Sequence, residues 1–321
     1  MQFDNKYYER FCRDNAFSEG SSFHKAFGYD FVYHCTGTEN KNDTLFTAGY
    51  GMNSAPHIMT ALQIVKMIRL QIAGYKTQIV LGDYDVLLAR DYMDAKRIAN
   101  GYEEFILSLG YDINQGILRK QSTETEVAAN VVFLSSKLDE DDFDYVKEDL
   151  FGYYQGDVAP LSFSTKVSIV LMLSDFISPL INKNYSRVIV TSGIDESKYV
   201  VLADKLINRL SINGSIGGFF TKVVKGLNNH PKMSKSKPDS GVFLSDDENS
   251  IKEKMISSLS NDKESLQYQI ALLAETSFSK QQIETAFDNN DIKMMHTIID
   301  ETIEYIIGIA SKWKKSNNTE E

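Results

Sequence analysis

Two kinds of hydrophobic pattern alternate along the first two thirds of the chain. Short apolar runs of β-type composition, each leading into a glycine-containing turn, predict buried strands. These runs are Thr44–Tyr50, Thr77–Leu81 and Arg187–Ser192. Between the first two runs, Gly51 begins a loop, Pro56 is suited to the first turn of a helix, and Gly74 follows the helix end near Ile72. One face of that helix carries Ile58, Leu62, Val65 and Ile68.

Strand, helix and strand at this spacing form a βαβ unit, which implies parallel strands joined by a right-handed crossover. Further helices are predicted over residues 91–109, over residues 164–177, where Pro179 is expected to end the helix, and over residues 197–210. The predicted fold class is therefore α/β, a doubly wound parallel sheet with helices on both faces.

Every segment after Asp246 has a helical pattern, and the last is a predicted helix from Met294 to Trp313. We therefore expect three regions: an N-terminal extension over residues 1–43, a catalytic domain with a helical insertion over residues 44–245, and a C-terminal helical domain over residues 246–321.

The formal net charge of −10 argues against sequence-independent coating of nucleic acid, although it leaves room for a local basic face that holds one RNA. Cys12 and Cys35 match no zinc pattern and are too few for a disulfide framework, so we expect a reduced, cytoplasmic setting. No run approaches the roughly 18 consecutive apolar residues of a membrane helix. The N-terminus lacks the apolar core of a secretory signal.

Lysines and small hydroxyl residues alternate in the segment Lys232, Met233, Ser234, Lys235 and Ser236. Lysines on a mobile loop supply compact positive charge where charge accumulates on a pyrophosphate leaving group. Read without context, the same segment is a solvated basic loop.

A second candidate lies where the helix after the first strand begins. A helix start offers unpaired backbone N–H groups, which suit a phosphate. The segment there includes His57, Ile58, Met59 and Thr60. By itself, His57 is an ordinary histidine at a helix start.

A third candidate is the turn after the strand 187–192, with Gly193, Asp195 and Glu196. A carboxylate at the carboxyl end of a strand in an open α/β sheet can accept hydrogen bonds from ribose hydroxyls. From local sequence alone, Asp195 is equally suited to cap the next helix.

Two more carboxylate positions stand out. Asp175 interrupts the apolar helix that contains Met172, and a carboxylate there needs a partner, which a ligand can supply. Asp83 and Asp85 follow the strand 77–81; they suggest either a structural turn or a metal site.

Together these segments resemble the class I aminoacyl-tRNA synthetases, and specifically the tryptophanyl/tyrosyl family. Lys232–Ser236 is the full Lys-Met-Ser-Lys-Ser signature of that class. His57 and Ile58 match the first half of its His-Ile-Gly-His signature, whereas Met59 and Thr60 replace the glycine and the second histidine. The resemblance covers residues 44–259 and implies a Rossmann-like fold of the HUP type.

The resemblance also implies roles for single residues. Lys232, Lys235, His57 and Thr60 would act in catalysis. The residues that would bind ATP are Gly51, Asn53, His57, Met59, Gly193, Asp195, Lys232, Met233, Ser234, Lys235 and Ser236. The amino acid would contact Met172, Asp175 and Glu196, with Asp175 accepting the indole N–H and Glu196 binding the amino group. Tyrosyl enzymes usually have glutamine where Met172 stands, so tryptophan is favoured over tyrosine.

The implied reaction is ATP-dependent formation of an aminoacyl-adenylate and transfer of the amino acid to tRNA. The implied partners are ATP with Mg²⁺, an aromatic amino acid, tRNA and a second copy of the chain. No association with a membrane is implied. After Ser236 there remain 85 residues, few for a domain that reads an anticodon. Three alternatives stay open: a tyrosine-specific enzyme, a paralogue that acts outside translation, and a non-catalytic module that binds an amino acid or RNA.

Overall fold

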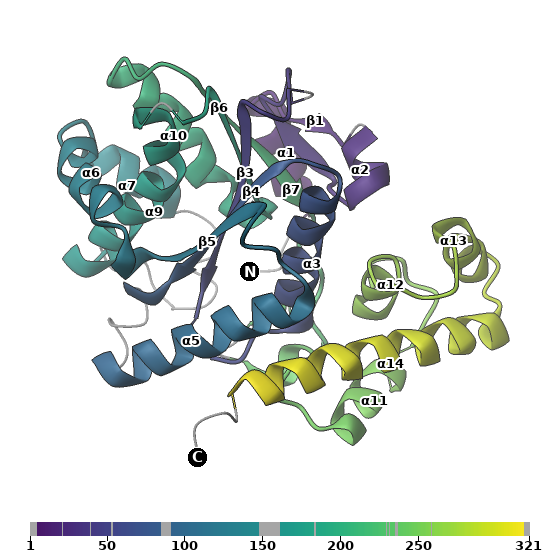
Figure 1. The fold of residues 1–321 in the computed structure, drawn as a ribbon. Helices are drawn as coiled ribbons and strands as arrows, with labels where there is room; N and C mark the ends of the chain where they lie inside the picture. Colours follow the sequence, from purple (N-terminus) through teal and green to yellow (C-terminus); the bar gives the residue numbers. More distant parts are fainter. Residues whose placement is uncertain are drawn as a thin grey trace. The chain divides into compact units, whose positions relative to one another are not determined.

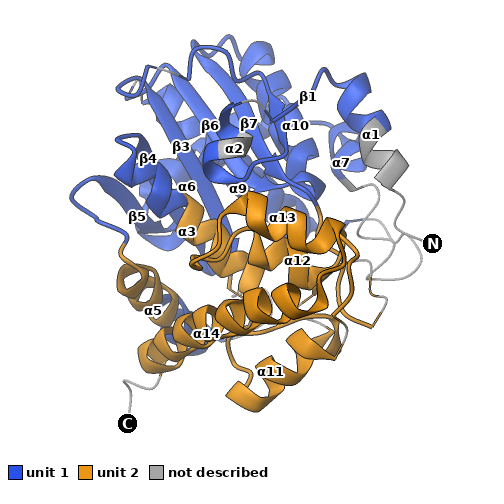
Figure 2. Ribbon diagram, turned by 90° about the vertical axis from the view of Figure 1, so that its right-hand side faces the viewer, with its two compact units in different colours: residues 1–51, 67–99, 111–222 blue, residues 52–66, 100–110, 223–321 orange. Residues whose placement is uncertain are grey.

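The computed structural model describes residues 5–20, 22–38, 40–52, 54–84, 91–147, 161–182, 184–228, 230, 232–234, 237–257 and 259–317. The chain folds into two compact units (Figure 2). Unit 1 comprises Met1–Gly51, Met67–Ala99 and Tyr111–Lys222, and unit 2 comprises Met52–Lys66, Asn100–Gly110 and Val223–Glu321. The two units are each made of several separate chain segments, so they do not test the domain boundaries predicted near residues 43 and 245. Those boundaries stay predictions.

Unit 1 is built on a seven-stranded sheet with the order β1-β2-β7-β6-β3-β4-β5 (Figure 1). The strands are β1 Ser18–Glu19, β2 Phe31–Tyr33, β3 Thr44–Gly51, β4 Lys76–Gly82, β5 Gly116–Lys120, β6 Arg187–Gly193 and β7 Ser215–Thr221. Strands β3 to β7 are parallel. The parallel part of the sheet starts in the middle with β3, proceeds outward to β5, then returns beside β3 as β6. This is the doubly wound topology with its switch point between β3 and β6, and it confirms the predicted fold class.

The helices of the chain, as the structure describes them, largely follow the predicted periodicity. They are α1 Asn5–Asp14, α2 Ser22–Phe27, α3 Ile58–Ile72, α5 Tyr92–Leu109, α6 Thr125–Ser135, α7 Glu140–Lys147, α9 Phe163–Ile181, α10 Ser197–Arg209, α11 Glu248–Ile256, α12 Leu266–Ala271, α13 Lys280–Asp288 and α14 Ile292–Asn317. The short 3₁₀ turns are η1 Gln121–Thr123, η2 Ile194–Glu196 and η3 Pro238–Ser240. The expectation that Pro179 ends its helix is wrong, because α9 continues to Ile181 with the proline inside its last turn.

Alternation along β3 places helices on both faces of the sheet in unit 1. The Phe46 ring lies 5.9 Å from Phe23 of α2 on one face. The next residue, Thr47, points to the other face and lines the same pocket as residues of α9. On that account α2 and α9 lie on opposite sides of β3.

Residues before Thr44 contribute to the sheet of unit 1, which the sequence pattern did not indicate. β2 pairs antiparallel with β7, with Val32 opposite Phe219. The ring of Phe17 lies 4.9 Å from Tyr33 and 5.4 Å from Phe220. This aromatic packing holds the N-terminal segment against the edge of the sheet, because such rings bury large apolar areas.

Helix α9 is long and apolar enough to cross a bilayer, by length and composition alone. In the structure 61% of its most apolar stretch is buried, and the helix packs against α6, α10 and β6. Its polar residues Ser174 and Asp175 are also buried and hydrogen-bonded. These are the properties of a core helix of an α/β unit.

Unit 2 is organised around the long helix α14, which packs against α11, α12 and α13. The indole ring of Trp313 makes edge contacts with Tyr102 and Phe105 of α5, at centroid distances of 4.8 and 5.3 Å. The Tyr102 hydroxyl donates to the carbonyl of Ser54 at 2.7 Å. Through Tyr102, helix α14 supports the loop that leads into α3.

Candidate functional site

A pocket of about 260 Å³ opens in unit 1 where β3, β4 and β6 end. Strand residues Gly49–Gly51, Gly82 and Thr191 line one part of it, and residues of α9 line another. Its place is the topological switch point, where open α/β sheets bind their ligands.

The pocket brings together the residues predicted from separate segments to bind an amino acid. Met172, Asp175 and Glu196 all line it, as does Gly51. Met172 and Asp175 come from α9, whereas Glu196 ends η2 after β6. These two segments are far apart in sequence, and the fold of unit 1 alone makes them neighbours of one cavity.

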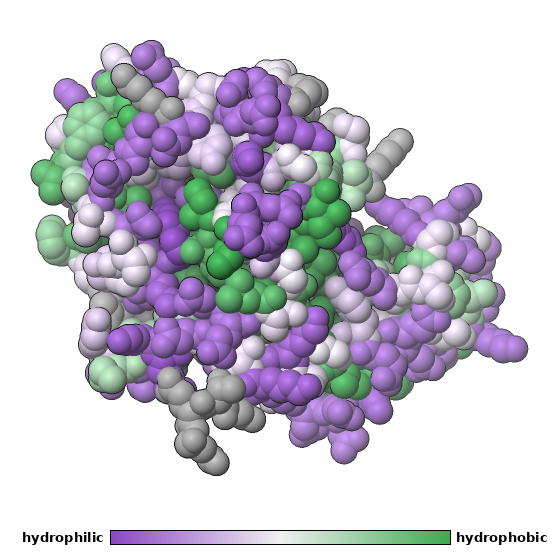
Figure 3. All heavy atoms as spheres, viewed as in Figure 1, coloured by the Kyte–Doolittle hydropathy of each residue, from purple (hydrophilic) through white to green (hydrophobic). Residues whose placement is uncertain are grey.

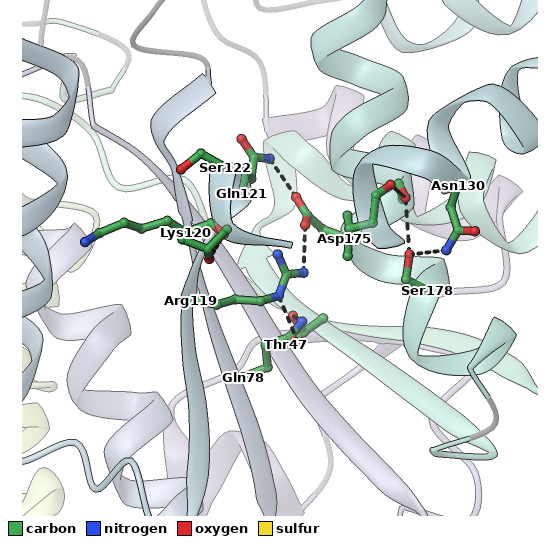
Figure 4. Close-up of polar contacts among 12 residues, drawn as sticks. Thr47, Gln78, Arg119, Lys120, Gln121, Ser122, Asn130, Asp175 and Ser178 are labelled. Atoms are coloured by element: carbon green, nitrogen blue, oxygen red, sulfur yellow. Dashed lines mark hydrogen bonds and ion pairs between the residues drawn. The ribbon is translucent and has the colours of Figure 1, made fainter. Parts of the chain in front are cut away.

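Asp175 is buried, with 3% of its surface exposed, and lies in a hydrogen-bond network that the sequence did not reveal (Figure 4). Arg119 Nη2 donates to Asp175 Oδ1 at 2.7 Å, and Gln121 Nε2 donates to Asp175 Oδ2 at 2.6 Å. Arg119 Nε lies 3.4 Å from Gln78 Oε1, and Gln78 Nε2 donates to Thr47 Oγ1 at 3.0 Å. The network joins β3, β4, β5 and α9 beside the pocket.

Asp83 anchors the turn η1 to the end of β4. Its Oδ1 accepts from Ser122 N at 3.0 Å, and its Oδ2 accepts a short hydrogen bond from Ser122 Oγ. These bonds favour the structural interpretation of Asp83, while Asp85 lies outside the described residues. In the part of the chain that the structure describes, no three His, Cys, Asp or Glu side chains gather to hold a metal ion.

Two buried polar atoms of the pocket lining have no hydrogen-bond partner among the described residues. They are the Tyr50 hydroxyl and Gln121 Oε1. A buried polar group without a partner costs free energy, and a ligand is one way to supply the partner. Burial raises the pKa of Tyr50 well above its ordinary value, and nearby Tyr29 and Glu196 raise it further, so the phenol keeps its proton.

Gly193, Asp195 and Glu196 lie at the carboxyl end of β6, as predicted. A β-carbon on Gly193 would collide with Asp195 Oδ1, so the glycine leaves room for that carboxylate. Asp195 does not occupy the N-cap position of α10. The N-cap of α10 is Glu196, and it makes no side-chain cap bond.

In unit 2, the start of α3 is joined to the segment after the lysine-rich loop. Ile58 N donates to Val242 O at 2.9 Å, and Leu244 N donates to Pro56 O at 3.0 Å. Between these bonds His57 pairs antiparallel with Phe243, and their rings lie 6.4 Å apart. The start of α3 and the segment that follows the lysine-rich loop, remote in sequence, are therefore side by side within one unit.

His57 and Thr60 contact each other at the first turn of α3. Thr60 N lies 3.2 Å from His57 Nδ1, and Thr60 Oγ1 lies 3.4 Å from both ring nitrogens. Thr60 is 8% exposed and Met59 is 7% exposed. The side chain that replaces the family's glycine, Met59, is therefore packed into unit 2.

The described part of the lysine-rich loop is fixed at its serine. Ser234 N donates to Ser240 Oγ at 2.8 Å, and Lys237 N donates to Ser234 O at 2.9 Å. Met233 is buried beside Gly241, and Lys232 is half-buried. Lys235, Ser236 and the predicted ATP-binding residue Asn53 lie outside the described residues.

Comparison with known proteins agrees with this geometry. Residues 170–310 match the family model described as tRNA synthetases class I (W and Y). These residues belong to the tryptophan and tyrosine branch of the class I tRNA synthetases. They include Met172, Asp175, the segment after β6 and the lysine-rich loop. The expected family is thereby confirmed.

Three known proteins are similar to this chain in sequence or in fold. The tryptophan–tRNA ligase of Methanocaldococcus jannaschii is 29% identical over 108 residues, which span 30% of this chain and 28% of that protein. The tryptophanyl-tRNA synthetase of Aeropyrum pernix superposes with a TM-score of 0.76 at 16% identity, over 97% of this chain and 94% of that one. The tyrosyl-tRNA synthetase of Archaeoglobus fulgidus gives 0.70 at 15% identity, over 87% and 92%. Both structures share the fold.

Sequence reasoning missed three residues of the pocket region: Tyr50, Arg119 and Gln121. Arg119 and Gln121 belong to β5 and η1, and β5 itself was not predicted because its burial does not alternate cleanly. Arg119 lies in a short run with few apolar residues, so nothing in the neighbouring sequence indicates that it is buried. Its partner Asp175 was recognised, and the demand of that carboxylate for a cation was the available indication.

Proposed function

We propose that this protein activates an aromatic amino acid, tryptophan in preference to tyrosine, as an aminoacyl-adenylate and transfers it to tRNA. The observation that carries the proposal is the pair of backbone hydrogen bonds joining residues 56–58 to residues 242–244. They hold the helix start that suits a phosphate beside the segment that directly follows the lysine-rich loop.

The chemistry requires positioning and charge stabilisation without a covalent protein intermediate. One carboxylate oxygen of the amino acid attacks the α-phosphorus of ATP and forms a C–O–P bond, while the bond to the pyrophosphate oxygen breaks and pyrophosphate leaves. We assign Lys232 and Lys235 to the negative charge that develops on the phosphates. His57 and the backbone at the start of α3 would hold the nucleotide, with Thr60 in contact with the His57 ring.

Selection of the amino acid is assigned to the pocket of unit 1. Its apolar lining includes Ile169, Met172 and Phe176, and its polar groups include Asp175, Glu196 and Gln121. A lining that combines these apolar side chains with polar groups suits a flat aromatic side chain that carries one hydrogen-bonding atom. We assign Glu196, which also lines the pocket, to the α-ammonium group.

The remaining partners follow as part of the same proposal. Mg²⁺ would arrive bound to the phosphates of ATP. Both cysteines are in the thiol form in the structure, which supports the reducing setting of the cytoplasm. A second copy of the chain is proposed to cover exposed apolar side chains on α6, where Val132 is 76% and Phe133 is 46% exposed (Figure 3). Light scattering at micromolar concentration, with Val132→Lys as the disrupting variant, tests the dimer.

One observation supports a second candidate, an adenylate-forming paralogue that does not charge tRNA. Residues 246–321 carry 15 acidic and 8 basic side chains. RNA binding relies on lysine and arginine at phosphates, and this region offers more repulsion than attraction.

ATP–pyrophosphate exchange measured against all twenty amino acids tests the activation step. We expect exchange with tryptophan above all others; exchange with none of them would reject the enzyme. Adding total tRNA and following radiolabelled tryptophan into acid-insoluble material then separates the two candidates, because the paralogue would form the adenylate and leave tRNA uncharged.

A further inference from the structure

Both oxygens of the Asp175 carboxylate are already engaged by neighbouring side chains. Oδ1 accepts from the Arg119 guanidinium and Oδ2 from the Gln121 amide, at 2.7 and 2.6 Å. The ion pair is almost sealed from solvent, with side-chain exposures of 7% for Arg119 and 5% for Asp175. The carboxylate therefore acts as an acceptor on both oxygens and offers no donor to its neighbours.

The chemistry of that carboxylate fixes the orientation of Gln121. An amide has a donating NH₂ end and an accepting oxygen, and the donating end must face Asp175. The oxygen Oε1 is then turned away from Asp175, as Figure 4 shows. Oε1 is buried and has no partner among the described residues, although Gln121 lines the pocket.

Gln121 is also held from the other side. Ser122 is bonded to Asp83 through both its backbone N–H and its hydroxyl, which fixes η1 at the end of β4. With 5% of its surface exposed, Gln121 has little room to turn. The result is an acceptor oxygen held in a fixed direction, on a side chain that lines a cavity together with Met172 and Phe176.

We propose that Gln121 Oε1 is the acceptor that reads the N–H donor of the substrate's aromatic side chain, with Asp175 as the residue that positions Gln121 and Arg119 as the residue that holds Asp175. The proposal rests on the function proposed above and deepens it. Selection of tryptophan then depends directly on the Gln121 amide oxygen, and the Asp175 carboxylate acts only by orienting Gln121. A substrate without the donor would leave Oε1 buried and unpaired, which is the usual origin of strong rejection.

The test compares tryptophan with its benzothienyl analogue, in which sulfur replaces the indole N–H at nearly constant shape. Titration calorimetry and ATP–pyrophosphate exchange are measured for both compounds on each protein. The native protein is expected to prefer tryptophan by about tenfold or more, the effect of one buried hydrogen bond. Gln121→Leu is expected to bring the two compounds within about twofold of each other.

Gln115→Leu is the matched control. Gln115 also donates its amide to an aspartate, Asp112, at 2.8 Å, but it is exposed and lies outside the pocket. The same chemical change there should leave the native preference intact. Melting temperatures from circular dichroism show whether each variant is folded, and the ratio of two ligands on one protein cancels partial losses of active protein.

Asp175→Asn separates positioning from direct contact. If Asp175 acts through Gln121, the single variant Asp175→Asn shows a lower preference for tryptophan over its analogue. In the Gln121→Leu background the same substitution then causes no further change in that preference. If the carboxylate itself contacts the indole, Gln121→Leu keeps the native preference and Asp175→Asn alone removes it, which overturns the proposal. Absence of binding and of exchange with every amino acid rejects the proposed function and this inference together, whereas tryptophan activation with an unaltered ratio in Gln121→Leu rejects the inference alone.

Discussion

Arg119 on β5 and Asp175 on α9 form an ion pair 2.7 Å long, with side-chain exposures of 7% and 5%. The two residues are 56 positions apart, so the pair exists because the sheet brings β5 beside the helix that crosses it. One further donor of Arg119, Nη1, is buried without a partner among the described residues. Removing either charge of this pair should therefore lower the free energy of unfolding.

Replacing Asp175 by alanine should strongly destabilise the protein. The Arg119 charge would stay buried without its counter-ion, which costs about 3–5 kcal/mol. Urea unfolding followed by circular dichroism measures the loss. The exposed pair Arg97–Asp94 supplies the control, since Asp94→Ala should cost about 1 kcal/mol or less. The double variant Arg119→Met, Asp175→Leu should recover much of the stability, because it removes both buried charges. A loss below about 1 kcal/mol for Asp175→Ala would show that the pair is not buried as described.

Lys235→Ala should lower the rate of ATP–pyrophosphate exchange by about a hundredfold, since preorganised charge at the phosphates is removed. We expect the free energy of unfolding to change by no more than about 0.5 kcal/mol, because the role assigned to this lysine lies in the reaction and not in folding. Lys237→Ala, the same change at an exposed lysine two positions on, should keep at least half of the native rate. Equal rates for native protein and Lys235→Ala would remove the lysine from the mechanism.

Gly241→Ala should impair the lysine-rich loop while leaving the remainder of unit 2 folded. A β-carbon at this position would lie 2.6 Å from Met233 Sδ and closer still to its Cγ, so the Met233 side chain must move. We expect the KM for ATP in the exchange assay to rise about tenfold, since small displacements of positioning residues have large effects on rate. Gly308→Ala on α14 is the control: its β-carbon meets no atom within 4 Å, and alanine should stabilise the helix by about 0.5–1 kcal/mol. Native kinetics in Gly241→Ala would mean that Met233 adjusts without moving the loop.

Alkaline pH should unfold the protein through its buried tyrosines. Burial is the main cause that raises the pKa of Tyr29, Tyr50 and Tyr102 above the ordinary value. Below about pH 10 both folded and unfolded chains keep these protons, and the stability they contribute is fully present. Above about pH 10 the unfolded chain loses the protons that the folded chain retains, so the free energy of unfolding falls as the pH rises.

Absorbance at the phenolate band, recorded together with circular dichroism, checks this expectation. Part of the signal of the 17 tyrosines should appear only when the native circular dichroism is lost. Complete and reversible titration near pH 10, with native circular dichroism retained, would contradict it.

Local pattern was sufficient for most of the elements and for the position of the signature segments along the chain. β3, β4 and β6 are continuous apolar runs, and α3 and α14 carry apolar stripes, so the period of the sequence matches the element formed. β7 was missed because Gly217 and Gly218 interrupt its run, and Gly217 is needed where the backbone of residues 33–34 approaches. That approach comes from a strand nearly two hundred residues earlier, which no local window contains.

By itself the sequence determined the parallel α/β core and the helical C-terminal region, which depend on periodicity and residue type and are therefore local. The roles given to the lysine-rich loop and to Met172, Asp175 and Glu196 came from the resemblance of short motifs to a known family, and they stay predictions. Only the tertiary structure decided that Arg119 neutralises Asp175, that Gln121 presents its oxygen, and that His57 pairs with Phe243. The physical reason is that burial and partnership depend on residues distant in sequence, and the chain must fold before a buried charge can meet its counter-ion.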